Sequence, residues 1–125
     1  MRMNSNTVDL HIPGGESMRL VARLATVGYI ASAGLTLDEA EDMKIAVAEA
    51  LGAVGGEQLH VQFSTVDGAV EIAVVGDGKG APREEVESEI ARYVLRSLAD
   101  EVEIEENGAG QIGSIRMKKR LSGGA

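Results

Sequence analysis

Two expected β-hairpins constrain the fold of this chain more than any other feature. Segments 59–63 and 70–74 alternate apolar and polar residues, and Asp67-Gly68 between them is a strong hairpin turn signal. A second hairpin is expected over residues 102–121, turning on an Asn-Gly-Ala-Gly sequence. Hairpins join antiparallel strands, so the sheet is expected to be mostly antiparallel.

Three other segments show the apolar spacing of amphipathic helices. The first helix is expected over residues 16–33, with Gly34 as its C-terminal cap. The second has a clear start because Thr36 and Glu39 form a capping box, and it closes at 55–56. Pro82 suits the first position of the third helix. The apolar stripes that define the first and third helices are Leu20, Leu24, Val27 and Ala31, and then Val86, Ile90, Val94 and Leu98.

A short strand over residues 7–12, stopped by Pro13, precedes the first helix. The expected order is therefore β-α-α-β-β-α-β-β, which indicates an α+β two-layer sandwich with three helices on one face of the sheet. The 125 residues suit a single domain spanning 1–125. Residues 1–6 and 122–125 are expected to be frayed.

Composition excludes several classes of function. The chain has no Cys and only two His, so no disulfide scaffold, Cys nucleophile or metal site is expected. Neither a membrane span nor a secretion signal is visible, which makes the cytoplasm the default location. The net charge of −8 argues against a nucleic-acid partner, because phosphates would be repelled.

Three features are candidates for a function, each with a simpler explanation. Glu49 lies in an otherwise uncharged helical run, where it is either solvent-facing or placed for chemistry. The loop 76–80 has glycines that let a backbone approach a phosphate or a base, yet it could be a plain loop. Arg19 and Arg23 share one helix face, either as a docking patch for an acidic partner or as a solvated face.

The second helix carries a resemblance to a known family. Residues 35–50 begin with acidic side chains and continue into Ala46-Val-Ala-Glu-Ala50. This closely resembles the second helix of the bacterial anti-sigma-factor serine kinases, which belong to the histidine-kinase-like (GHKL) ATPase superfamily. With the order of elements, the resemblance covers roughly residues 8 to 121. It implies the Bergerat fold of that superfamily.

The resemblance also assigns roles to residues, and several positions depart from the family pattern. Glu49 falls on the catalytic carboxylate, the general base on a substrate serine. The metal-binding Asn of the family corresponds to Ala53, which offers no oxygen to Mg²⁺. The adenine-binding Asp corresponds to Gly76, and Asp77 stands one position late.

Parts of the nucleotide loop remain, and parts of the lid do not. Gly78 and Gly80 are kept, so nucleotide contacts, if any, are expected from them and from a displaced Asp77. The lid glycines of the family correspond to Glu89 and Ala91, which places a negative charge where phosphates would lie.

These departures predict a degenerate member: a non-catalytic, pseudokinase-like binding module in bacterial sigma-factor and stress-response control. Its expected partner is a sigma factor or an anti-sigma-factor antagonist, bound through Arg19 and Arg23 and in a homodimer as in the family. Arg23 aligns with a first-helix Arg through which the family contacts these partners. No cofactor is expected. Two alternatives stay open: an active serine/threonine kinase that uses ATP and Mg²⁺, and a scaffold or sensor subunit without nucleotide or sigma binding.

Overall fold

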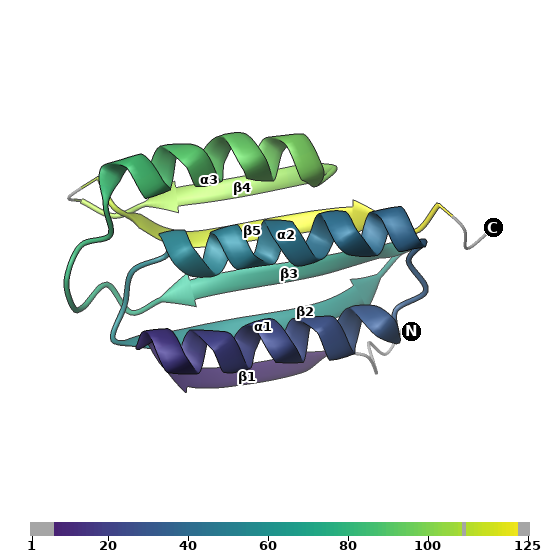
Figure 1. Ribbon diagram of the computed structural model, residues 1–125, viewed down its shortest axis with the longest axis horizontal. Coiled ribbons are helices and arrows are strands. Elements are labelled where there is room, and N and C mark those ends of the chain that lie inside the picture. The colour runs from purple at the N-terminus through teal and green to yellow at the C-terminus, as the bar shows by residue number, and fades with distance from the viewer. Residues whose placement is uncertain (1–6, 109, 123–125) are drawn as a thin grey trace.

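The computed structural model describes residues 7–108 and 110–122, and the elements follow the predicted order (Figure 1). The elements are β1 (Val8–Pro13), α1 (Glu16–Ala31), α2 (Leu37–Ala53), β2 (Gln58–Val66), β3 (Ala69–Gly76), α3 (Glu85–Leu98), β4 (Glu101–Glu106) and β5 (Ile112–Arg120). Of the ends predicted to fray, 1–6 and 123–125 lie outside the described residues. In the described part of the chain, no helix combines the length and apolarity that crossing a membrane requires.

The sheet is antiparallel throughout, with strand order β1-β2-β3-β5-β4. All three helices cover one face of it (Figure 1), so the predicted α+β two-layer sandwich is confirmed. The β2–β3 hairpin turns at the predicted residues, where Asp67 has φ 53° and Gly68 has φ 74°. Positive φ at both central positions matches the right-handed twist of the flanking strands.

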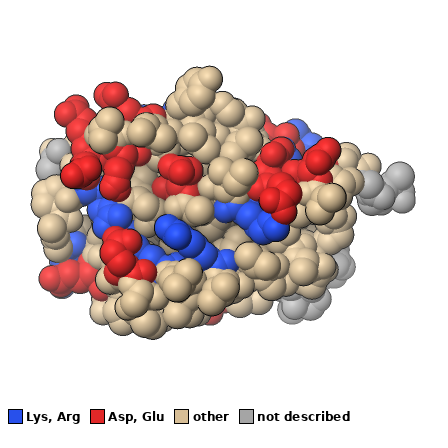
Figure 2. All heavy atoms as spheres, in the orientation of Figure 1, with Lys and Arg blue, Asp and Glu red and all other residues tan. Residues whose placement is uncertain are grey.

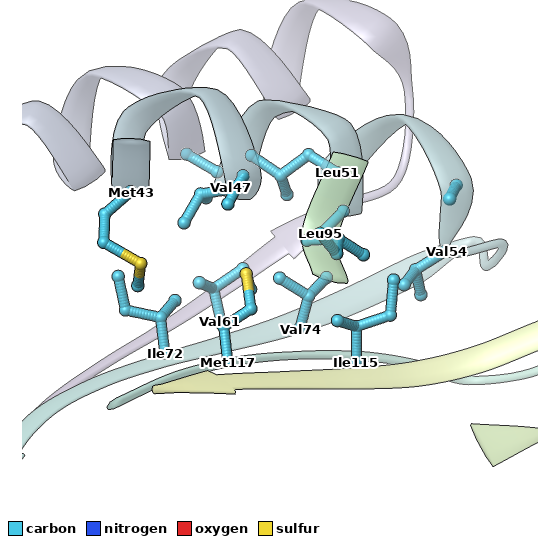
Figure 3. Packing of buried hydrophobic residues seen from close by; sticks show 14 of the residues in the cluster. Met43, Val47, Leu51, Val54, Val61, Ile72, Val74, Leu95, Ile115 and Met117 are labelled. Carbon is cyan, nitrogen blue, oxygen red and sulfur yellow. The ribbon is translucent and has the colours of Figure 1, made fainter. Parts of the chain in front are cut away.

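The core lies between α2 and the central strands. Met43, Val47 and Leu51 of α2 are fully buried and point toward side chains of the sheet, including Ile72 and Met117 (Figure 3). These three residues belong to the apolar stripe whose helical spacing predicts this helix, so that stripe faces the sheet. Because α2 is flanked by α1 and α3, it is the element that fixes the middle of the helix layer.

The predicted capping box fixes the start of α2. The Glu39 backbone N–H donates to Thr36 Oγ1 at 3.2 Å, and the Thr36 N–H donates to Glu39 Oε1 at 2.8 Å. The Glu39 carboxylate also accepts hydrogen bonds from the hydroxyl and the backbone N–H of Ser122. These bonds, the Ser122 hydroxyl first, lower the pKa of Glu39 to about 2.

The apolar stripe predicted for α1 is exposed rather than buried. The exposed fractions of Leu20, Leu24 and Val27 are 52%, 64% and 46%. The buried face is a second row at helical spacing, formed by Arg19, Ala22, Thr26 and Ile30. The polar residues of this row can be buried because they are hydrogen-bonded. Thr26 Oγ1, for example, donates to the Ala22 carbonyl at 2.8 Å. The helix also ends at Ala31, before the predicted Gly34 cap.

The third helix departs from its prediction in the same way. It begins at Glu85, and Pro82 lies in the preceding loop rather than at the first helical position. Its buried residues are Ser88, Ala91 and Leu95, whereas Val86 and Ile90 are 60% and 52% exposed. A spacing of four drifts around a helix of 3.6 residues per turn, so the predicted stripe runs from the outer face toward one flank.

Candidate functional site

Glu49 lies half-buried on α2, one turn before Ala53. Its side chain is therefore neither fully exposed to solvent nor held in place by polar partners. Within residues 7–108 and 110–122, no hydrogen bond or ion pair involves its carboxylate. Ala53 is 1% exposed and belongs to the hydrophobic core. The position that carries the metal-binding Asn in the family is therefore packed among apolar side chains.

Gly76, to which the resemblance assigns the place of the family's adenine-binding Asp, is enclosed by backbone. A Cβ built on Gly76 would stand 1.9 Å from the Gly55 carbonyl oxygen and 3.1 Å from a methyl group of Val54. The connection between α2 and β2 thus lies directly against the end of β3. Gly14, at the end of β1, meets the Gly56 carbonyl oxygen equally closely, at 2.0 Å from its hypothetical Cβ. The glycines at both strand ends allow this close approach.

The carboxylate of Asp77 holds its loop in place through hydrogen bonds with backbone N–H groups. Its Oδ1 accepts from the backbone N–H groups of Glu57 at 2.9 Å and Lys79 at 3.0 Å, and its Oδ2 from that of Gln58 at 3.2 Å. The hydrogen bond from Lys79, followed by those from Glu57 and Gln58, holds the pKa of Asp77 below its usual range. A carboxylate engaged in this way would have to give up these bonds before it could accept from an adenine amino group.

Arg83 ties the loop after β3 to all three helices, which the sequence did not indicate. Its Nε donates to the Gly52 carbonyl of α2 at 2.7 Å. Its guanidinium also lies 3.2 Å from the Glu16 carboxylate of α1 and 3.9 Å from that of Glu87 of α3. Its backbone N–H donates to Gln111 Oε1 at 2.8 Å. Residues 77–84 are therefore anchored across the end of the helix layer.

Two cavities lie at this end of the molecule, and one of them borders the loop. One of about 140 Å³ is lined by Gly78, Gly80 and their neighbours, and it is smaller than the roughly 300–1,000 Å³ common for small-molecule sites. The other, of about 470 Å³, lies between α3 and the β4–β5 hairpin. Its charged lining consists of Glu85, Glu89, Glu106 and the Arg92 that pairs with Glu106, so negative charge is in excess and disfavours an anion. Among the described residues, no cluster of three or more His, Asp or Glu is arranged to hold a metal.

Arg19 does not form the docking patch predicted with Arg23, because its side chain is buried. The residue is 2% exposed, and its guanidinium donates to the carbonyls of Leu51 and Val54, the latter at 2.8 Å. It donates from Nε to the Gly14 carbonyl as well. The last carbonyls of a helix lack partners within the helix, so Arg19 completes the C-terminus of α2. Burial, followed by the charge of Arg83, lowers the pKa of Arg19.

Arg23 is exposed, as predicted, and lies among the exposed apolar residues of α1. No hydrogen bond or ion pair of its guanidinium is found in the part of the chain that the structure describes. We call Leu20, Arg23, Leu24 and Val27 the α1 surface. On the helix face of the molecule, basic side chains gather along the middle and acidic ones lie around them (Figure 2).

The order and arrangement of the helices and strands are those that the resemblance implies. No model of a protein family matches the chain. The chain is 26% identical to the serine-protein kinase RsbW of Bacillus subtilis strain 168 over 119 residues, which cover 88% of this chain and 72% of that protein.

A solved structure agrees in fold. The crystal structure of the RsbU and RsbW domains of a Mycobacterium tuberculosis protein matches with a TM-score of 0.66 at 17% identity. The match covers 92% of this chain, which spans about a third (32%) of that longer one. The predicted resemblance is thereby confirmed: the chain is similar in sequence to one RsbW serine-protein kinase and in fold to an RsbW-containing structure.

Proposed function

We propose that this chain is an anti-sigma-factor-like regulator that acts by binding a protein partner and performs no phosphoryl transfer. The α1 surface carries this proposal. Three large apolar side chains, 46–64% exposed, surround an arginine that has no ion pair among the described residues. Exposed apolar patches mark interaction sites, and Arg is enriched in their energetic centres.

The resemblance names the class of partner. Arg23 corresponds to a first-helix Arg through which the anti-sigma-factor kinases contact sigma factors and their antagonists. The proposed partner is therefore a sigma factor or an anti-sigma-factor antagonist. It would place a carboxylate on Arg23 and apolar side chains on Leu20, Leu24 and Val27, because an unpaired guanidinium within apolar surface is best satisfied by an acidic group.

The residues at the nucleotide positions of the family do not fit a magnesium nucleotide, which supports the non-catalytic part of the proposal. Mg²⁺ requires oxygen ligands, and Ala53 supplies a methyl group inside the core. Gly76 has no room for a carboxylate, and Asp77 is engaged with three backbone N–H groups. Glu49 keeps the family's residue type, as Gly78 and Gly80 do, but a base without a positioned phosphoryl group has no reaction to assist.

The test is recovery of the partner from the source cell in buffer without nucleotide. Tagged wild-type protein is expected to recover a sigma factor or an antagonist. Arg23→Ala and Leu24→Ser are expected to lower recovery about tenfold, the effect of losing an interface centre worth about 1.4 kcal/mol. Arg96→Ala, an exposed arginine on α3, is the matched control. Recovery of neither partner class, or equal recovery by all variants, would favour the scaffold alternative.

A further inference from the structure

The outer face of α3 carries a second apolar stripe that nothing in the described chain covers. Val86, Ile90 and Tyr93 are 60%, 52% and 77% exposed. Their spacing of four and then three residues places them on one line along the helix, opposite the buried Ala91 and Leu95. Tyr93 is also the most exposed of the three aromatic residues in the chain, since Tyr29 of α1 is half-buried and stacks on the buried Phe63 of β2.

Two glutamates without ion pairs border the first half of this stripe, and Arg92 and Arg96 lie further along the same helix. Glu85 and Glu89 are both exposed, lie one turn apart, and form no ion pair within residues 7–108 and 110–122. Two nearby glutamates do have ion pairs, since Glu87 pairs with Arg83 and Glu106 pairs with Arg92. Like charges at this spacing disfavour a helix slightly, and a cation brought from outside would relieve the repulsion.

We propose that Val86, Ile90, Tyr93, Glu85 and Glu89, here called the α3 surface, dock a basic amphipathic helix of a protein partner. Apolar residues of that helix pack on the stripe, and its Lys or Arg side chains pair with the two glutamates. An amphipathic helix docks through anchor residues three and four positions apart, and the apolar residues of this stripe have the same spacing. The border charges repel an anionic membrane or a nucleic acid.

The α3 surface is separate from the α1 surface, because α2 lies between the two helices (Figure 1). Their chemistry is also opposite. The unpaired charge is a cation at Arg23 and is anionic at Glu85 and Glu89, so one partner segment does not fit both surfaces equally. This second surface extends the proposed function and does not depend on it.

The proposal is tested by the fluorescence anisotropy of a labelled peptide with the full chain. The probe has about 18 residues, or five helical turns, of Leu and Lys at amphipathic helical spacing, and a matched peptide has Glu in place of Lys. Wild-type protein is expected to bind the Lys peptide, more weakly as salt is raised, and to bind the Glu peptide at least tenfold more weakly.

Paired variants separate the α3 surface from general attraction to an acidic protein. Ile90→Ser with Tyr93→Ala is expected to weaken binding about tenfold, and Glu85→Gln with Glu89→Gln about fivefold. Two controls are expected to bind within twofold of wild type. Asp38→Asn with Glu57→Gln removes the same charge elsewhere, and Leu20→Ser with Leu24→Ser removes apolar surface from α1.

Several results would overturn the assignment. They are absence of binding to the Lys peptide, equal weakening by the controls, and insensitivity to Glu85→Gln with Glu89→Gln. Sedimentation velocity of wild type and of Ile90→Ser with Tyr93→Ala tests for a second copy, since a dimer lost in the variant would assign the face to self-association. Vesicles of phosphatidylglycerol that bind the wild type and release it on Tyr93→Ala would assign the face to a membrane.

Discussion

The carbonyl oxygen of Gly55 lies 1.9 Å from the place where a Cβ of Gly76 would stand. This contact joins the connection after α2 to the end of β3, and only glycine permits it. The resemblance to the anti-sigma-factor kinases assigns to position 76 the aspartate that binds adenine in those proteins. The close packing of the backbone here and a carboxylate at position 76 are therefore mutually exclusive without movement of the chain.

Restoring the family residue with Gly76→Asp is expected to destabilise the fold by about 3 kcal/mol, because backbone must shift to admit the side chain. Urea denaturation measures this. Gly52→Ala is the control, since nothing lies within 4 Å of its Cβ and it stands in a helix, so a gain of about 0.5–1 kcal/mol is expected. A Gly76→Asp protein as stable as wild type would contradict the proposed closure.

The two arginines of α1 are expected to respond in opposite ways. Arg19→Ala leaves the carbonyls of Leu51 and Val54 without their buried donor, which is expected to cost about 3 kcal/mol of stability. Arg19→Lys is expected to recover little, because an ammonium cannot reproduce the fork of donors. Arg23→Ala is expected to stay within about 0.5 kcal/mol of wild type while losing the partner. Thermal unfolding measures the three stabilities. A less stable Arg23→Ala than Arg19→Ala would contradict this assignment.

Exposed and buried leucines provide a test of which helix faces are covered. Leu24→Ser is expected to change stability by less than about 0.5 kcal/mol, since the side chain is 64% exposed. Leu95→Ala is expected to cost about 2–5 kcal/mol, because Leu95 is fully buried. Equal destabilisation by the two changes in chemical denaturation would mean that the α1 surface packs against something within the protein.

Acid is expected to weaken the anchor between Glu39 and Ser122. The pKa of Glu39 lies at about 2, below its ordinary 4.5, so the ionised form stabilises the fold. That contribution is fully present above about pH 4.5 and is lost as the pH falls toward 2. Glu39→Gln keeps the capping box without titrating. Its urea midpoint is therefore expected to fall less between pH 5 and pH 3 than that of wild type, and an equal fall would reject the link.

Local signals in the sequence predicted much of the fold. The capping box at Thr36 and the turn at Asp67-Gly68 are formed by residues within four positions of one another, and both are confirmed. The order of elements followed from such signals. The covered faces predicted for α1 and α3 were wrong, because each helix buries a row that includes polar residues such as Arg19 and Ser88. Apolar periodicity selects the other row, which is exposed.

The site depended on contacts between distant residues and was less predictable. The bonds of Arg19 reach carbonyls more than 30 positions away, and Arg83 joins Glu16 from 67 positions away. The contact between Gly55 and Gly76 likewise arises only when α2 has packed on the sheet. Sequence indicated that Gly76 replaces an aspartate, but the absence of space for that aspartate is a property of the folded chain.

Calorimetric titration with Mg-ATP tests the central claim, binding without nucleotide chemistry, most directly. An active RsbW-type kinase titrated under the same conditions is the positive control. No heat of binding is expected for this chain at concentrations where the control saturates. Micromolar binding of Mg-ATP, followed by transfer of phosphate to a serine of a partner protein, would contradict the account and establish an active kinase.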